Sequence, residues 1–422
     1  MSGIMRKRKL KRSMLIKACL ILLAGFLAGS FLSQGSLFRE SQDGLMSGMV
    51  RAQERSGCLT TNVVKAQENV ENPGNAENLD ATAENDTAVR LAQEILDGMT
   101  LEEKVGQMFV ARCPEENAAE KAAAYHLGGY ILFGRDLSGK TQEEVVQNIR
   151  SYQEAAKIPL FIGVDEEGGT VNRVSTNPNL RAAPFWSPQK LYKKGGFELV
   201  RSDTKEKCDL LRSLGINLNM APVCDVSQNP KDFIYKRSFG QDAEQTARYV
   251  QTVVEVMDQE NMGSVLKHFP GYGNNADTHT GMAYDGRSYE TFQTADFLPF
   301  QSGIDSGADM VLVSHNIVKC MDEQYPASLS PKVHEILRTE LGFSDVIMTD
   351  DLAMGAVGDF VPAGQAAVFA VQAGNDILCC TDFEVQMQAV LEAVQSGEIS
   401  EERIDESVLR ILRCKISRGI VQ

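Results

Sequence analysis

Short runs of apolar residues recur along the chain between residues 107 and 380, and stretches with helical periodicity separate them. Several of these runs are continuously hydrophobic rather than alternating, which is typical of parallel strands that are covered on both faces. The pattern predicts eight strands, most of them followed by a helical segment. The predicted strands span residues 107–111, 129–133, 160–165, 217–222, 264–269, 310–314, 346–350 and 376–380.

Eight units of strand and helix predict an α/β fold in which the strands close into a (β/α)8 barrel of the TIM type. A doubly wound open sheet is the alternative. No G-x-G-x-x-G motif follows the first predicted strands, and this weakens a dinucleotide-binding version of the open sheet. Just before the first strand, Thr100 and Glu103 have the spacing of a capping box and predict the start of a helix.

The N-terminal part of the chain differs in composition from the rest. Basic residues from Arg6 to Lys17 precede an apolar run at residues 18–32, which is the order found in a secretory signal peptide or a signal-anchor. The following residues are rich in Gln, Asn, Glu, Ser and Gly and have few large apolar side chains, which predicts disorder. We therefore expect an extracytoplasmic protein, either secreted or anchored in the membrane by its N-terminal segment. Its expected parts are the signal or anchor segment (1–38), a disordered linker (39–88) and a single catalytic domain (89–422).

Composition narrows the class of protein further. A formal net charge of −15 argues against a nucleic-acid partner, because phosphate contacts need a clustered basic surface. The nine cysteines include no C-x-x-C spacing, so neither a zinc site nor a redox motif is indicated, and we expect no metal and no cofactor. The adjacent Cys379 and Cys380 lie in an apolar run, and we interpret them as core residues.

Polar side chains gather at the C-terminal ends of four predicted strands. In a barrel these ends form the face that carries catalytic residues. Each residue taken singly can also cap a helix or join a buried polar network. Their occurrence at four strand ends together favours a catalytic site. The residues are Asp165, Glu166 and Glu167 after the third strand, Lys267 and His268 in the fifth, Ser314 and His315 after the sixth, and Asp350 and Asp351 after the seventh.

One stretch is more specific than any other. The segment Lys267-His-Phe-Pro-Gly-Tyr-Gly273, followed by Asp277-Thr-His279, resembles the K-H-F-P-G-x-G…D-x-H signature of family 3 glycoside hydrolases, especially the bacterial β-N-acetylglucosaminidases. Further matches follow the same order along the chain. They are Asp165-Glu-Glu-Gly-Gly-Thr-Val-Asn-Arg173 to D-x-E-G-G-x-V-x-R, Ala221-Pro-Val-Cys-Asp225 to A-P-V-x-D, Arg237-Ser-Phe-Gly240 to R-S-F-G, and Val346-Ile-Met-Thr-Asp350 to the strand of the nucleophile.

The resemblance implies a role for each matching residue. Asp350 is expected to be the nucleophile of a retaining β-N-acetylhexosaminidase, and His279, paired with Asp277, is expected to be its acid/base. The expected substrate is a glycoside with terminal, non-reducing β-linked N-acetylglucosamine, such as a muropeptide fragment or another oligosaccharide. The residues expected to hold the sugar hydroxyls are Asp165, Arg173, Arg237, Lys267 and His268.

These roles agree with the chemistry of the side chains. A carboxylate that attacks the anomeric carbon forms a covalent glycosyl-enzyme, and attack by water then restores the original configuration. Most retaining glycosidases use a second carboxylic acid as acid/base, whereas this branch is expected to use a histidine. An aspartate partner fixes the imidazole tautomer and stabilises its protonated form, so that Asp277 would support proton transfer by His279.

Other readings of the same residues stay open. One is an exported β-glucosidase or glycoside phosphorylase of the same family, and another is a barrel that binds carbohydrate without catalysis. Tyr272 stands where many relatives have histidine, which leaves contacts near the leaving group uncertain. Asp351 follows the expected nucleophile, and we expect it to cap the next helix or to orient its neighbours.

Overall fold

The structure is a computed structural model, and it describes residues 87–275, 281–358, 360–362 and 364–422. The predicted signal or anchor segment, all but the last two residues of the predicted linker, and the pair Asp277 and His279 lie outside the described residues. No helix in the described part of the chain combines the length and the apolar character needed to cross a membrane.

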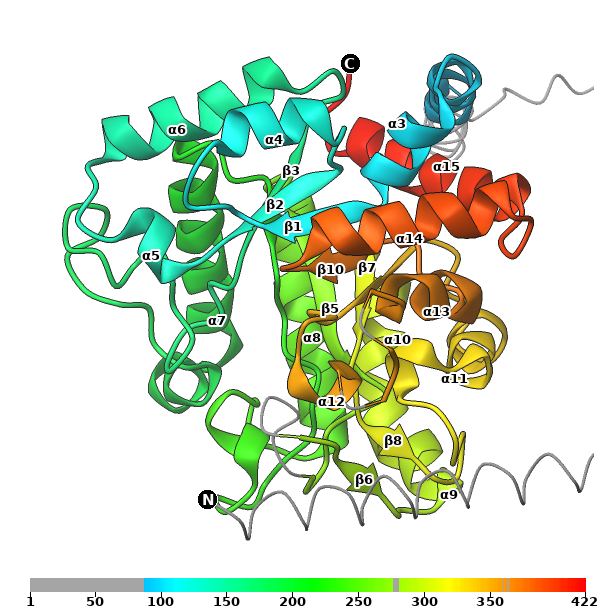
Figure 1. Ribbon diagram of the computed structural model, residues 1–422. Helices are drawn as coiled ribbons and strands as arrows, with labels where there is room; N and C mark the ends of the chain where they lie inside the picture. The colour runs from blue at the N-terminus through cyan, green and yellow to red at the C-terminus, as the bar shows by residue number, and fades with distance from the viewer. Residues whose placement is uncertain (1–86, 276–280, 359, 363) are drawn as a thin grey trace, which may run out of the picture. The chain divides into compact units, whose positions relative to one another are not determined.

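Eight parallel strands form the centre of the fold, in the order β10-β1-β2-β3-β4-β5-β7-β9 (Figure 1). A parallel bridge between Met348 and Ile377 and a hydrogen bond of 3.0 Å from Thr349 N to Ile377 O join β9 to the chain entering β10, which closes the barrel. The predicted (β/α)8 barrel is therefore confirmed. Its strands are β1 Phe109–Arg112, β2 Gly129–Leu132, β3 Phe161–Val164, β4 Leu218–Asn219, β5 Gly263–Phe269, β7 Met310–Val313, β9 Val346–Thr349 and β10 Leu378–Cys380.

Helices cover the outside of the barrel, as the apolar stripes in the sequence require (Figure 1). The first described helix includes residues 87–97. The others are α3 Leu101–Gln107, α4 Ala118–Ala124, α5 Gly134–Leu137, α6 Gln142–Ala155, α7 Pro188–Ser213, α8 Ala243–Gln259, α9 Tyr289–Thr291, α10 Phe297–Asp305, α11 Pro331–Glu335, α12 Gly355–Gly358, α13 Ala366–Ala373, α14 Phe383–Gln395 and α15 Glu401–Ser417. Shorter helical turns include η1 Phe233–Lys236 and η5 Ile336–Glu340.

The predicted strand ends differ from the observed ones in two places. The first strand was expected to begin at Gln107, but the capping box of Thr100 and Glu103 is formed and helix α3 extends through Gln107. Residues 217–222 were expected as the fourth strand, yet only Leu218–Asn219 is assigned as strand β4. The sequence also gave no sign of the small parallel sheet of β6 (Tyr284–Asp285) and β8 (Ile317–Val318), because two-residue strands are too short to show a period.

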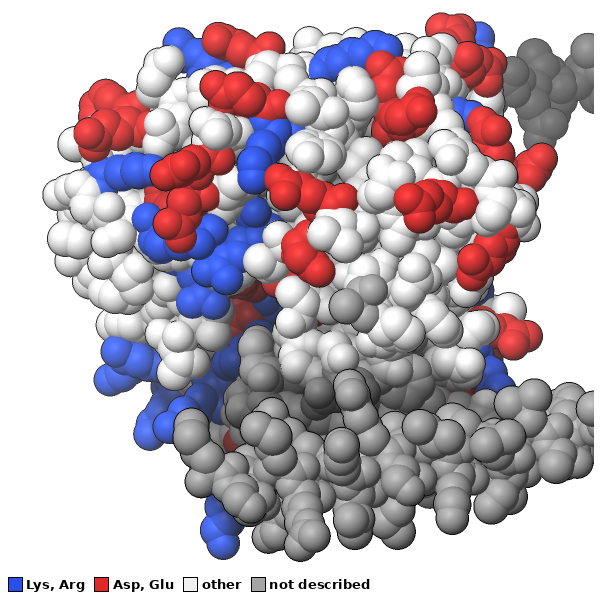
Figure 2. All heavy atoms as spheres, viewed as in Figure 1, with Lys and Arg blue, Asp and Glu red and all other residues white. Residues whose placement is uncertain are grey.

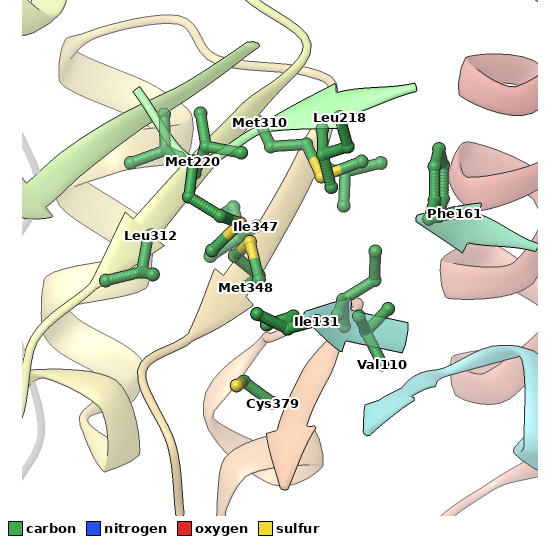
Figure 3. Packing of buried hydrophobic residues seen from close by; sticks show 14 of the residues in the cluster. Val110, Ile131, Phe161, Leu218, Met220, Met310, Leu312, Ile347, Met348 and Cys379 are labelled. Atoms are coloured by element: carbon green, nitrogen blue, oxygen red, sulfur yellow. The ribbon is translucent and has the colours of Figure 1, made fainter. Parts of the chain in front are cut away.

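Apolar side chains fill the interior of the barrel. Figure 3 shows side chains from different strands gathered between them, among them Val110, Leu218, Met310, Ile347 and Cys379. The cysteines of the described residues are free, and all except Cys320 are buried, which confirms Cys379 and Cys380 as core residues. Close packing of this kind leaves little freedom to the strands, so the polar residues at their C-terminal ends are held on a rigid frame. We call the C-terminal ends of the eight strands the barrel mouth.

Candidate active site

A buried lysine lies at the centre of the polar cluster in the barrel mouth. The Nζ atom of Lys267, on β5, lies 2.6 Å from Asp165 Oδ1 and 2.6 Å from Glu167 Oε1. Burial opposes the charged form of the lysine, but the carboxylates of Asp165 and Glu167 outweigh it and raise the pKa of Lys267. The lysine thus stays charged and joins two carboxylates that follow β3.

Arg237 extends this cluster from the turn after η1. Its Nε donates to Glu167 Oε2 at 3.0 Å and its Nη2 donates to Glu167 Oε1 at 2.8 Å. Burial acts to raise the pKa of Glu167, yet the positive charges of Lys267 and Arg237 outweigh it and hold this pKa far below its usual range. Glu167 is therefore held in its charged form and orders two cations. It was predicted among the polar residues at the strand ends, but not among those expected to hold the sugar hydroxyls.

His268 is held in one tautomer by its two neighbours. Its Nδ1 lies 2.7 Å from Asp225 Oδ2, and its Nε2 lies 3.0 Å from Nη2 of Arg237. Because a guanidinium group can only donate, Nε2 accepts and the ring proton resides on Nδ1, from which it is donated to Asp225. The other oxygen of Asp225 accepts the backbone N–H of Tyr272 at 2.7 Å, so one carboxylate fixes both the imidazole and the start of the following loop.

The backbone of β5 explains why two consecutive residues enter the same cluster. In a regular strand, neighbouring side chains point to opposite faces. The pairing of β5 with β7 shifts register between Leu266 and Phe269, which is a bulge-like irregularity. Such an irregularity redirects side chains locally, and both Lys267 and His268 reach Arg237 or its partner Glu167.

Glu166 acts as a brace for the loop that carries Arg173. Its carboxylate accepts the backbone N–H groups of Arg173 at 2.8 Å, Val174 at 2.7 Å and Ser175 at 3.3 Å, and also the hydroxyl of Ser175. The side chain of Glu166 is fully buried. The two adjacent glutamates therefore have different tasks, since Glu166 orders the backbone and Glu167 orders the cations.

Asp350 lies at the same end of the barrel, immediately after β9. Its backbone N–H continues the ladder to Val313 O at 3.1 Å, and its Oδ1 accepts the backbone N–H of Asp351 at 2.9 Å. Burial raises the pKa of the Cys379 thiol well above its usual value, and the carboxylates of Asp351, Asp350 and Asp165 each add to the effect. Asp350 therefore lies at the barrel mouth, as the lysine cluster does.

Asp351 has the supporting role that was expected of it. Its Oδ1 accepts the backbone N–H groups of Ala353 at 2.9 Å and Thr381 at 3.2 Å, and its Oδ2 accepts the Thr381 hydroxyl at 2.5 Å. The buried His315 donates from Nε2 to Asp351 O at 3.0 Å, because a carbonyl oxygen can only accept. The turn that carries Asp350 is thus tied to β7 and β10.

The loop that leaves β5 is anchored by a second arginine. Nη2 of Arg287 donates to Gly271 O at 3.1 Å, while its guanidinium also binds the carboxylates of Asp285 and Asp296 at 2.8 Å each. Asn275 Nδ2 donates to Asp285 at 2.8 Å. Gly271 through Asn275 are therefore fixed by Arg287 and Asp285 on the chain segment that follows, and residues 276–280 connect to this anchored part.

The structure brings four of the predicted sugar-binding residues into one hydrogen-bonded network: Asp165, Arg237, Lys267 and His268. Arg173 follows β3 on the same loop, but its guanidinium contacts the ring of Phe133 instead. Glu167 was predicted as a polar residue at a strand end but was given no role in the site, and Asp225 was not singled out at all. Both stood inside the quoted motifs, so the motif matches were the signal that could have found them.

Comparison with known proteins agrees with a carbohydrate-active barrel. The model of the glycosyl hydrolase family 3 N-terminal domain matches residues 100–414. The chain therefore belongs to glycoside hydrolase family 3.

Among the described residues, no group of three or more histidine, cysteine, aspartate or glutamate side chains is arranged to hold a metal ion.

Relatives within the family include bacterial β-hexosaminidases. The β-hexosaminidase of Xanthomonas campestris pv. campestris (strain B100) is 31% identical over 288 residues, which are 67% of this chain and 85% of that protein. Beta-hexosaminidase A of Pseudoalteromonas piscicida is 29% identical over 325 residues, which are 70% of this chain and 54% of that protein. The chain thus spans about half the length of this second relative.

Solved structures also match this chain. A family 3 β-N-acetylglucosaminidase from Paenibacillus sp. str. FPU-7 matches with a TM-score of 0.71 and 34% identity over 76% of this chain and 63% of that chain. LpqI of M tuberculosis matches with a TM-score of 0.68 and 28% identity over 74% of this chain and 93% of that chain.

Proposed function

We propose that this protein is a retaining β-N-acetylhexosaminidase that releases terminal, non-reducing β-linked N-acetylglucosamine from oligosaccharides. The observation that carries the proposal is that Asp350 and the Asp165–Glu167–Lys267–Arg237 cluster lie at the same end of the barrel. The names of the related β-hexosaminidases and of the Paenibacillus structure support the choice of an N-acetylated sugar.

The cluster is suited to hold sugar hydroxyl groups in one orientation. The two carboxylates that bind Lys267 Nζ occupy two of the three donors of that ammonium group, which leaves one donor for a hydroxyl. Asp165 and Arg237 keep exposed side-chain surface of 19% and 16%, so both can still contact a ligand. Paired donors and acceptors of this kind fix the ring so that its anomeric carbon faces the nucleophile.

In the proposed reaction, a carboxylate oxygen of Asp350 forms a bond with the anomeric carbon while the bond to the leaving oxygen breaks. His279, paired with Asp277, gives its proton to that oxygen, and then takes a proton from the water that cleaves the glycosyl-aspartate ester. The water supplies the hydroxyl of the product, and Asp350 returns to its starting state. Arg287 would hold the beginning of the loop that leads to His279.

The test is hydrolysis of a chromogenic N-acetyl-β-glucosaminide beside the matching β-glucoside. The wild-type chain is expected to prefer the N-acetylated substrate. Asp350→Ala should lower kcat/KM by on the order of ten thousandfold or more, because the covalent intermediate no longer forms. His279→Ala should strongly slow substrates with poor leaving groups. His126→Asn, at an αL position outside the mouth, serves as the control and should keep full activity.

Two results would overturn the proposal. A folded wild-type chain that cleaves neither glycoside would favour a barrel that binds carbohydrate without catalysis. A reaction that requires inorganic phosphate would favour a phosphorylase, so the assay is run with and without phosphate.

Muropeptide fragments are the proposed substrates, and the proposed location is outside the cytoplasm. The basic and then apolar order of residues 1–38 supports this location. Protease treatment of intact cells that produce the full chain gives a direct test. Digestion of the barrel agrees with the proposal, whereas protection until the cells are lysed contradicts it.

A further inference from the structure

The only tryptophan of the chain, Trp186, lies between β3 and α7 with 42% of its surface exposed. The Nζ atom of Lys190 lies 3.8 Å from the centroid of the indole, so an ammonium group covers one face of the ring. The indole Nε1–H has no acceptor among the described residues. A single exposed apolar residue is common on protein surfaces, so the meaning of this ring depends on the surface beside it.

A cavity of about 380 Å³ lies beside this ring, between residues 181–186 and helix α7. It spans a kink in α7, where Gly196 has a φ of 61° and interrupts the helix. Leu191 lines the cavity before the kink, Leu199 lines it after the kink, and Pro184 adds a third apolar group. The volume is that of a small-molecule site, for which about 300–1,000 Å³ is typical.

The polar side chains that line the cavity mainly offer acceptors. Glu206 binds Arg181 through Oε1 at 2.9 Å, and Asp203 binds Lys207 through Oδ2. The second oxygen of each carboxylate has no hydrogen-bond partner in the part of the chain that the structure describes. The hydroxyl of Ser202 donates to a backbone carbonyl at 3.2 Å, which leaves its lone pairs to accept. A ligand that satisfies these groups must supply several donors.

The charges around the cavity favour a neutral ligand. Each lining carboxylate is already paired with a cation, so a positively charged ligand meets no uncompensated anion among the described lining residues. Figure 2 also shows Lys and Arg side chains gathered on the side where α5 and α7 lie in Figure 1, whereas Asp and Glu dominate over α14. A negatively charged ligand would be repelled by the free carboxylate oxygens. Hydroxyl groups are neutral donors, and a sugar ring combines several of them with an apolar C–H face.

The segment that carries Trp186 packs on the loop of the active site. The backbone N–H of Gly169 donates to Phe185 O at 3.0 Å, and Trp186 O lies so close to Gly168 that no side chain fits there. Gly168 directly follows Glu167 of the lysine cluster. The cavity shares no described lining residue with that cluster, yet its tryptophan is held by the same loop.

We propose that the cavity beside Trp186 is a second carbohydrate-binding site, separate from the mouth, which holds one neutral sugar unit of an oligosaccharide. The indole packs on the C–H face of the sugar, while the free oxygens of Asp203 and Glu206 accept its hydroxyl groups. The choice of N-acetylglucosamine as that sugar rests on the proposed function. A chain long enough to reach both sites gains in effective concentration at the mouth.

The test uses the tryptophan fluorescence of the full chain, which comes from Trp186 alone. The Asp350→Ala variant, which is expected not to cleave the ligand, is titrated with the β-1,4-linked dimer to pentamer of N-acetylglucosamine. The emission should change and saturate, because the sugar replaces water at the ring. Ser202→Arg in the same background fills the cavity with a long side chain and should abolish the change.

Ser213→Arg is the matched control for this substitution. Ser213 is also an exposed serine of α7 whose hydroxyl donates to a backbone carbonyl, at 2.7 Å, but it does not line the cavity. Its variant should bind as tightly as the Asp350→Ala parent. The inference is overturned if no oligosaccharide changes the emission up to about 10 mM, ten times the Kd of a weak site. It is also overturned if Ser202→Arg keeps the change.

Two further variants separate this site from the mouth. Adding Lys267→Met, which alters the sugar cluster at the mouth, should keep the emission change, and its loss would place the signal at the mouth and overturn the inference. In that double variant, calorimetry should show that Trp186→Ala weakens binding about tenfold or more, as truncation of a tryptophan anchor does, whereas Trp186→Phe retains most of it. An unchanged Kd in Trp186→Ala overturns the inference.

The outcome for the second site can be told apart from the outcome for the proposed function. Binding at Trp186 by a wild-type chain that cleaves no N-acetyl-β-glucosaminide contradicts the proposed function alone. Normal cleavage without any emission change contradicts the second site alone.

Discussion

Buried charges occur at both ends of the barrel, but their surroundings differ. At the N-terminal end, the fully buried Asp376 lies 2.6 Å from Arg338 and 3.0 Å from Arg410, and it also accepts the backbone N–H of Ile347 and the hydroxyl of Ser407. These contacts attach η5 and α15 to the strands. At the mouth, in contrast, two members of the Lys267 cluster keep exposed side-chain surface, 19% for Asp165 and 16% for Arg237, through which they can contact a ligand.

Two lysines make the difference concrete. Lys104 in α3 binds Glu401 at 2.9 Å and Asp405 at 2.7 Å, just as Lys267 binds Asp165 and Glu167 at 2.6 Å each. The two sites have the same composition, one lysine and two carboxylates. What separates them is that the first joins two helices of the outer layer, while the second joins β5 to the segment after β3 at the barrel mouth. Position on the barrel, rather than residue type, distinguishes a structural ion pair from a binding one.

The largest effect is expected at the N-terminal end. Asp376→Asn leaves the surrounding arginines without their counter-charge, and breaking a buried ion pair in this way costs about 3–5 kcal/mol of unfolding free energy. Urea unfolding measures this loss, and the kcat of the protein that stays folded should be unchanged. A variant with normal stability but poor activity would contradict the structural role of Asp376.

At the mouth, a substitution is expected to lower activity more than stability. Lys267→Met is expected to lower kcat/KM for the N-acetyl-β-glucosaminide by about a hundred- to a thousandfold, because a preorganised donor to the sugar is lost. Lys104→Met is the matched control, and its kcat/KM should remain within about twofold of the wild type by the same reasoning. Equal losses of activity in both variants would show that the two lysines do not differ in the way described.

A third lysine, Lys415, extends the comparison to the pH dependence of stability. Lys415 is fully buried under the barrel, with Nζ 2.8 Å from Gln107 Oε1, and burial lowers its pKa to about 7. Between pH 7 and the ordinary lysine value of 10.5, the unfolded chain binds a proton that the folded chain has lost. Stability contributed by this group therefore rises with pH across that window, by up to about 1.4 kcal/mol per pH unit.

Urea unfolding at several pH values between 7 and 10 measures this slope. Lys415→Met should remove it, whereas Lys104→Met should keep it, because the carboxylate partners of Lys104 outweigh its burial and raise its pKa. The assignment to Lys415 fails if the slope survives in the Lys415→Met variant.

The smallest effect is expected for charges on the outer surface. Arg201 and Glu255 form an ion pair of 3.3 Å with side chains that are 44% and 35% exposed. Arg201→Gln should change the unfolding free energy by less than about 1 kcal/mol, since solvent screens such pairs. A larger loss would mean that exposure does not separate the weak pairs of this protein from the strong ones.

The barrel and the strand ends could be predicted because both are local properties of the chain. Runs of apolar residues marked all eight strands, and Lys267 and Asp350 were found as polar residues next to such runs. The partners within the site were harder to predict. Arg237 and Glu167 are 70 residues apart, and no periodic pattern indicates that they form a bidentate pair.

The same limit applies to the direction of side chains. Glu166 and Glu167 are identical and adjacent, yet the first turns to backbone N–H groups and the second to two cations. The conformation of the folded loop determines which partners each glutamate has. Likewise, Arg173 was expected in the hydroxyl-binding set, and its contact with the ring of Phe133 depends on a residue 40 positions earlier that sequence reasoning did not consider.

The ion pairs of Lys104 with Glu401 and Asp405 have a consequence for chain connectivity. They join α3, the helix before the first barrel strand, to α15, the last helix of the chain, so the first and last parts of the barrel domain are held together. The order in which the chain passes through the eight units is then not what keeps the barrel shut. A circularly permuted chain, with residues 100 and 418 joined by a linker and new ends in an outer loop, should fold to the same ring.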